Sequence, residues 1–229
     1  MVIRSIQPIK IFFTQLRSAV ESNSLPNSSY IIEKSQQLKL SPVDLLLGVL
    51  QPILYEIGNR YAQGKLTVFQ EHQFSALADQ IITRLSPNVT TIAPKNVDVL
   101  LVCCDTNYHY LGLRILELEL RSQGVSVFSI FPSLPNAEII KVAKNINPKL
   151  IGISVGLPRQ IPQAEELIQE LRKNSTIAFN PAIAIGGTGL REINKRQIND
   201  VDFVNNPENQ NDFLDFIERL KKETLAKAG

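Results

Sequence analysis

The spacing of apolar residues changes once along this chain, and that change limits what the chain can fold into. Up to about residue 85, apolar residues recur every three or four positions, which places them on one face of a helix. The first such set is Ile9, Phe12, Phe13, Leu16 and Val20. Beyond about residue 97, short apolar runs alternate with amphipathic stretches, a pattern typical of a parallel sheet covered by helices. We therefore expect a helical part followed by an α/β part.

Capping residues divide the helical part, residues 8–86, into helices joined by short connections. The expected helices are one from about Pro8 and three spanning Ser28–Leu38, Ser41–Gln63 and Thr67–Leu85. Ser41 followed by Pro42 is typical of an N-cap and first helical position, and Thr67 with Gln70 forms a capping box. We expect a kink at Pro52 because proline interrupts helical hydrogen bonding. Four helices with short connections predict a bundle.

The α/β part, residues 96–229, contains alternating strand and helix patterns. The expected strands are Val97–Cys104, Val125–Ile130, Leu150–Val155, Ala182–Ile185 and Asp202–Val204. The expected helices are Tyr110–Gln123, Asn136–Asn145, Gln160–Lys173, Gly189–Gln197 and Asn209–Ala226. This order predicts a five-stranded parallel sheet with helices on both faces.

Composition excludes several classes of protein. The formal charge is +2 and no run of Lys and Arg stands out, so we expect no direct binding to nucleic acid. Cys103 and Cys104 are neighbours in one expected strand and point to opposite faces, so they are expected to be free thiols in a reducing cytoplasm. The chain shows neither a secretory signal nor an apolar stretch of about 20 residues, so we expect no association with a membrane.

Three features fall at the carboxyl ends of expected strands, where open α/β sheets bind ligands. His109, one of two histidines, follows the first strand, Ser154 ends the third, and Gly186 with Gly187 ends the fourth. Imidazole is the commonest protein ligand for a transition metal. Taken singly, each feature has a plainer interpretation as a surface histidine, a turn or an ordinary serine. A G-x-G-x-x-G pattern is absent, which argues against a dinucleotide.

In combination, these residues resemble the cobalamin-binding domain family, whose pattern is Asp-x-His-x-x-Gly, then Ser-x-Leu, then Gly-Gly. The matching residues are His109, Gly112, Ser154, Gly186 and Gly187. The resemblance implies a Rossmann-like, flavodoxin-like domain that binds cobalamin. It also implies that His109 replaces the cofactor's benzimidazole as lower cobalt ligand, and that the displaced tail passes Ser154 and the two glycines. Whether the cofactor is the adenosyl, methyl or hydroxo form stays open.

Two positions depart from that pattern. Asn107 stands where the family has an acid, and a carboxylate behind a metal-bound imidazole orients the ring and raises its basicity. We therefore expect a weaker or differently tuned bond between His109 and cobalt, with Asp105 as an alternative acid nearby. Leu157 comes one residue later than the family's leucine.

The helical part also resembles the cap of light-sensing cobalamin regulators of the CarH and AerR type. Their cap has a tryptophan followed ten residues later by Glu-His, and here Tyr61 precedes Glu71 and His72 at that spacing. The resemblance implies that these residues cover the upper face of the cofactor. Ala62 occupies the position of a second histidine in these sensors, so a light-locked bis-histidine state is not expected. The alternative is that His72 continues a helix stripe with Phe69 as a core or boundary residue.

The resemblance implies a sensor or regulator rather than an enzyme. Because the bundle begins near residue 8, we expect no DNA-binding domain before it, and we expect action through a protein partner such as a transcription factor. Alternatives are a corrinoid methyl carrier, a binder of haem or a bilin, and a scaffold that has lost its cofactor. The sequence leaves the oligomeric state open, including a homo-oligomer.

Overall fold

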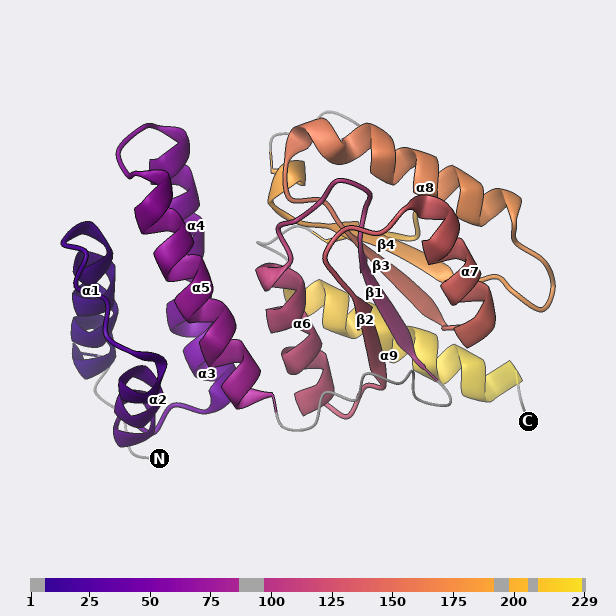
Figure 1. Ribbon diagram of the computed structural model, residues 1–229. Coiled ribbons are helices and arrows are strands. Elements are labelled where there is room, and N and C mark those ends of the chain that lie inside the picture. The colour runs from indigo at the N-terminus through magenta and orange to yellow at the C-terminus, as the bar shows by residue number, and fades with distance from the viewer. Residues whose placement is uncertain (1–6, 87–96, 192–197, 206–209, 228–229) are drawn as a thin grey trace. The chain divides into compact units, whose positions relative to one another are not determined.

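The computed structural model describes residues 7–86, 97–191, 198–205 and 210–227, and the chain divides into two compact units, Met1–Val89 and Thr90–Gly229 (Figure 1). The first unit is helical and the second contains the sheet. Residues 87–96, which join the two parts, lie outside the described residues.

The first unit consists of helices around an apolar core. Its elements are α1 (Gln7–Glu21), α2 (Ser28–Gln37), α3 (Pro42–Leu45), the π-helical turn η1 (Leu46–Leu50), α4 (Gln51–Ala62) and α5 (Val68–Leu85). Ser41 and Thr67 each form the expected capping box, with Asp44 and Gln70 respectively. The residues that pack inside include Phe12, Leu16, Ile31, Leu45, Ile53, Phe74 and Ile81. The predicted bundle of helices is confirmed.

The helix around Pro52 contains a wider turn that the sequence pattern did not predict. Proline lacks the N–H that would donate to the fourth residue before it, and its ring crowds that carbonyl. The chain responds with the turn η1, in which the Gln51 N–H donates to the carbonyl of Leu46, five residues back. The helix is therefore irregular next to Pro52, and the irregularity takes the form of a π-type turn just before the proline.

The second unit is a doubly wound α/β fold. Its strands are β1 (Val99–Cys103), β2 (Val127–Ile130), β3 (Leu150–Ser154), β4 (Ala182–Gly186) and β5 (Phe203–Asn205). Its longer helices are α6 (Leu111–Ser122), α7 (Asn136–Ile146), α8 (Ile161–Lys173) and α9 (Gln210–Lys227). All strand pairs are parallel and the order is β2-β1-β3-β4-β5, so the predicted flavodoxin-like sheet is confirmed.

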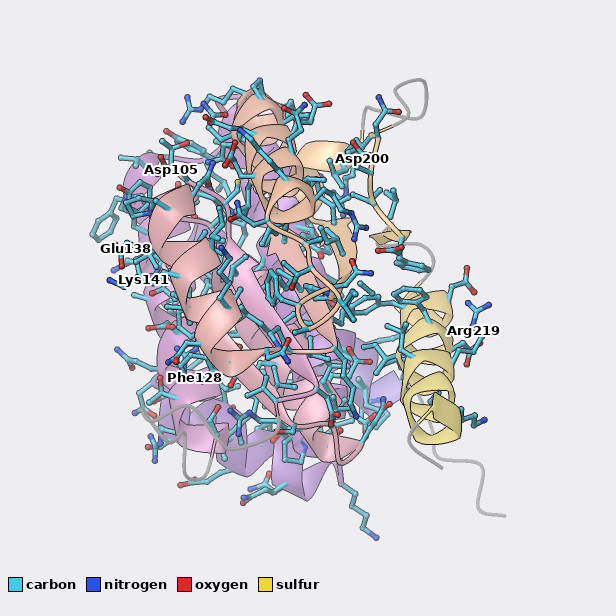
Figure 2. The ribbon with its side chains drawn as sticks, turned by 90° about the vertical axis from the view of Figure 1, so that its right-hand side faces the viewer. Asp105, Phe128, Glu138, Lys141, Asp200 and Arg219 are labelled. Carbon is cyan, nitrogen blue, oxygen red and sulfur yellow. The ribbon has the colours of Figure 1, made fainter. Side chains whose placement is uncertain are left out.

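Each face of the sheet has its own core. Successive residues of β1, such as Leu100 and Leu101, point to opposite faces. Helices α7 and α8 cover the face that contains Leu100, and α6 and α9 cover the face that contains Leu101 (Figure 1). Figure 2 shows Asp105 just beyond the end of β1 and Phe128 near the start of β2, at opposite ends of this part of the sheet.

One expected helix is wrong in its described portion. The pattern predicted a helix over Gly189–Gln197, but the chain after β4 forms the single 3-10 turn η3 (Thr188–Leu190), and residues 192–197 lie outside the described part. The turn is tied to the preceding loop, because the Gly189 N–H donates to the Val155 carbonyl at 3.0 Å. Local tertiary hydrogen bonding therefore replaces regular helix here.

In the described part of the chain, no single helix is both long and apolar enough to cross a bilayer. The segments Ser28–Gln37 and Pro42–Ala62 reach that length and hydropathy only as a pair, bent by 117°.

Candidate functional site

The loop that carries His109 is anchored by the buried side chain of Asn107. The Asn107 amide nitrogen donates to the Ser154 carbonyl at 2.8 Å, and its oxygen accepts the backbone N–H of His109 at 3.0 Å. The Asn107 carbonyl also accepts the N–H of Ser133 at 3.1 Å. Asn107 therefore fastens the end of β1 to the end of β3 and holds the backbone of His109, rather than standing behind its ring.

The His109 side chain is exposed beyond the carboxyl end of β1. Its neighbours differ: Tyr108 is 67% exposed, whereas the Tyr110 ring stacks on Phe131 with centroids 5.3 Å apart. Gly112 lies in the first turn of α6, where an added β-carbon would meet no other part of the protein within 4 Å. The imidazole thus projects from an anchored backbone and is available to a ligand.

The carboxylate of Asp105 is engaged within its own loop. It accepts the Thr106 N–H at 2.7 Å and the Ser133 hydroxyl at 3.1 Å. These bonds tie the β1 loop to the segment after β2. The expectation that Asp105 replaces the missing acid behind His109 therefore gains no support from the contacts of this carboxylate.

The loop after β3 passes directly under His109. A β-carbon at Gly156 would lie 2.7 Å from both Asn107 Oδ1 and His109 Cβ. Gln160, at the start of α8, holds this loop: its Oε1 accepts the N–H groups of Gly156 at 3.1 Å and Leu157 at 2.9 Å. The absence of a side chain at position 156 thus allows the two loops to touch.

The loop after β4 closes the site on the other side. The Thr188 hydroxyl donates to the Gly156 carbonyl at 2.7 Å. Gly187 has φ of +117°, and a β-carbon there would lie 2.2 Å from the Val155 carbonyl oxygen, so only glycine fits. Gly186 accepts the Val155 N–H at 2.8 Å. The carboxyl ends of β1, β3 and β4 therefore form one hydrogen-bonded surface, which brings His109, Ser154, Gly186 and Gly187 together.

Two buried thiols lie at the end of β1, beneath this surface. Burial raises the pKa of Cys103 to about 12 and that of Cys104 to about 11, with a smaller contribution from the neighbouring Cys104 and Asp105 respectively. Both cysteines are free, as the strand alternation predicted. Neutral, buried thiols are poor metal ligands and nucleophiles.

In the helical unit, Tyr61 and Ala62 end α4, and Glu71 and His72 lie in the first turns of α5. The Glu71 carboxylate pairs with His72 Nδ1 and also accepts the Ser75 hydroxyl at 2.8 Å. The His72 side chain is 74% exposed. This exposure of His72 contradicts the alternative of a core histidine. Phe69, in the same stripe of the helix, is also 58% exposed.

Comparison with known families decides the class of protein. One family model described as a B12 binding domain matches residues 29–86, and a second with the same description matches residues 97–211. The second match alone spans half of the chain. The chain belongs to the B12-binding family. Its cofactor is cobalamin.

Relatives of this B12-binding protein fall into two groups. It is 28% identical over 154 residues to the HTH-type transcriptional repressor CarH of Myxococcus xanthus, a match that covers 66% of this chain and 50% of that one. It is 26% identical to dimethylamine corrinoid protein 1 of Methanosarcina acetivorans, covering 68% of this chain and 73% of that one. The chain thus spans about half the length of the Myxococcus repressor.

A solved structure supports the fold of the whole B12-binding chain. The monomethylamine corrinoid protein of Methanosarcina barkeri superposes with a TM-score of 0.67 at 13% identity, over 97% of this chain and 99% of that one. At this level of identity the likeness establishes the α/β fold with its helical unit.

The donor set of the B12-binding site fits cobalamin. Among the residues described, no group of three or more His, Cys, Asp or Glu side chains gathers to hold a bare metal ion. A single exposed imidazole suits a metal whose other positions are filled by a macrocycle. Gly156 and Gly187 let the loops after β1, β3 and β4 pack against one another, since a β-carbon at 156 would meet Asn107 and His109 and one at 187 would meet Val155.

Two contributors to the site were missed by sequence analysis. Gln160 and Thr188 both bind the backbone of Gly156. Their signal is faint: a glutamine two residues after Pro158 and a threonine directly after the glycine pair. Neither residue type is specific enough alone to indicate a role.

Proposed function

We propose that this protein is a cobalamin-dependent sensor that regulates a protein partner, such as a transcription regulator. The observation that carries the proposal is the Glu71–His72 pair on α5, in which Glu71 also accepts the Ser75 hydroxyl and the His72 side chain is exposed. Glu71 engages Nδ1 of His72, which leaves Nε2 to face a ligand. The similarity to CarH of Myxococcus xanthus supports the same assignment.

In this proposal, His109 is the lower axial ligand to cobalt. Its backbone is already fixed through Asn107, so binding requires little ordering beyond the ring itself. Gly112, Ser154, Gly186 and Gly187 line the path of the displaced nucleotide tail. Asn107 binds the backbone of His109 and not its ring, so in this proposal it fixes the loop without raising the basicity of the imidazole.

Tyr61, Ala62, Glu71 and His72 serve the opposite face of the cofactor in this proposal. Tyr61 is 46% exposed and brings an aromatic surface, while Glu71 and His72 bring polar groups. Ala62 has no side-chain donor, so any light response would proceed without a second histidine bound to cobalt. In its adenosyl or methyl form, bound cobalamin would supply a cobalt–carbon bond whose cleavage is the cofactor's own chemistry.

Absorption spectra test the proposal. The purified protein is incubated with adenosyl-, methyl- and hydroxocobalamin, in the dark and after illumination. We expect a base-off, histidine-on spectrum that His109→Ala abolishes and His72→Ala retains. Incubation with haem and with biliverdin in parallel separates other tetrapyrroles. An unchanged spectrum in His109→Ala would refute the role of His109, and failure to bind any cobalamin would refute the function.

A corrinoid methyl carrier is the second candidate. It is favoured by the coverage of the corrinoid relatives, since the match spans 73% of dimethylamine corrinoid protein 1, against 50% of CarH. A carrier would accept a methyl group in its reduced cobalt(I) form and pass it to a separate methyltransferase. Methylation of the reduced protein by a methylamine and its partner enzyme, with no change of binding to a regulator on illumination, would favour this candidate over the sensor.

A further inference from the structure

Gln160 is a buried side chain whose amide groups all have partners in the candidate site. It is 2% exposed, although it lies in a short turn at the start of α8. Its Oε1 accepts two backbone N–H groups, from Gly156 and Leu157, and its Nε2 donates to the Thr106 carbonyl at 2.8 Å. The two N–H donors and the one carbonyl acceptor determine the orientation of the amide.

This amide links the two loops that meet at His109. Thr106 belongs to the loop after β1, three residues before His109, and Gly156 belongs to the loop after β3. The two loops also touch at Gly156, where a β-carbon would lie 2.7 Å from His109 Cβ. Asn107 makes a second link, but it binds the carbonyl of Ser154 at the end of the strand. Among the described residues, Gln160 thus links the two loops beyond the strand ends.

We propose that Gln160 is a positioning residue for His109: it fixes the loop after β1 so that the imidazole is placed to bind cobalt. This inference rests on the proposed role of His109 as the axial ligand. Without the Nε2–H, the Thr106 carbonyl loses this partner, and without Oε1 the buried N–H of Gly156 and the partly buried N–H of Leu157 lose theirs. Either loss lets the β1 loop move relative to Gly156, and a small displacement of a ligand weakens its bond to a metal.

Two substitutions of Gln160 distinguish the role of the amide nitrogen from that of the amide oxygen. Gln160→Glu keeps the acceptor oxygen toward Gly156 and Leu157 but, when ionised, places a second oxygen against the Thr106 carbonyl. Gln160→Met keeps the length and removes both functions. Gln169→Met, on the exposed side of α8, is the matched control.

The readout is the pH at which acid releases the imidazole from cobalt in the whole chain loaded with hydroxocobalamin. We expect the midpoint to rise by about one pH unit in both Gln160 variants, equivalent to a roughly tenfold weaker bond, and to stay unchanged in Gln169→Met. Cobalamin-free melting temperatures of all variants are measured alongside. Midpoints equal to wild type in both Gln160 variants would overturn the inference.

A second measurement uses the unmodified, cobalamin-free protein and does not depend on variant folding. Hydrogen exchange followed by NMR is expected to show protected amide protons at Gly156 and Leu157 and slowly exchanging Nε2 protons on Gln160. Unprotected exchange at these positions would overturn the positioning role. If wild type binds cobalamin without a histidine-on spectrum, the role of His109 fails, whereas protected amides would still establish the Gln160 link.

Discussion

At residue 156 the chain passes too close to the His109 loop to carry a side chain. We predict that Gly156→Ala destabilises the fold by about 1–3 kcal/mol, because the added methyl group would lie 2.7 Å from Asn107 Oδ1 and His109 Cβ. Cobalamin affinity should fall with it. Urea unfolding and a binding titration measure the two effects.

Gly58→Ala is the control for Gly156→Ala. Gly58 lies inside α4 with nothing within 4 Å of an added β-carbon, so alanine there should stabilise the fold by about 0.5–1 kcal/mol. Equal effects of the two substitutions would show that the close contact at Gly156 is not required.

The two cysteines give a prediction about pH. Burial raises the pKa of Cys103 to about 12 and of Cys104 to about 11, from 9.0. A raised pKa means that the folded state disfavours the thiolate. The stability that the two neutral thiols contribute to the fold is therefore complete below pH 9 and is lost as the pH rises toward 11–12. At pH 8 we expect the native thiols to react with a disulfide reagent about tenfold or more slowly than in denaturant. Equal rates in the two conditions would contradict the burial of these thiols.

At the scale of elements, the sequence predicted those helix starts and strands that depend on residues close together in the chain. Ser41 and Thr67 indicated where helices begin, and short apolar runs indicated all five strands. The π-type form of η1 goes beyond the kink expected at Pro52, and the 3-10 turn at Thr188–Leu190 was not predicted because it depends on a bond to the loop after β3. For the same reason the pattern indicated His109 but not Gln160, whose partners lie as far as 54 residues away in sequence.

The start of α5 offers a prediction about an element that carries Glu71 and His72. Gln70 accepts the Thr67 N–H and also donates to the carbonyls of Val20 and Glu21 at the end of α1. Thr67→Ala removes the cap alone and should cost about 1 kcal/mol. Gln70→Ala keeps the bond from the backbone N–H of residue 70 to Thr67 but removes the side-chain bonds to the Thr67 N–H and to α1, so its cost should be larger.

Chemical denaturation measures the stability of both variants. Thr83→Ala, later in α5, is the control, because its hydroxyl bonds the Asp79 carbonyl one turn earlier, and we expect a change within about 0.5 kcal/mol. A Gln70→Ala effect no larger than that of Thr67→Ala would show that the bonds to α1 contribute little.

At the scale of the whole molecule, the proposed ligand and the residues that position it belong to one compact unit. His109, Gln160, Thr188 and the strands that present them all lie within Thr90–Gly229, and both cores of the sheet are formed there. The helical unit has a core of its own. The sheet unit should therefore bind the cofactor without the helices, and the helices should affect how strongly it binds.

We predict that a fragment of residues 90–229 folds and binds hydroxocobalamin with the histidine-on spectrum, but at least about tenfold more weakly than the full chain, a loss of about 1.4 kcal/mol. The loss follows from removing Tyr61, Glu71 and His72, which are proposed to serve the other face of the cofactor. Circular dichroism establishes folding, and a spectral titration measures affinity. The same fragment with His109→Ala should lose the histidine-on spectrum. Equal affinity of fragment and full chain would show that the helical unit contributes nothing to binding, and a folded fragment with a base-on spectrum would place the cobalt ligand elsewhere.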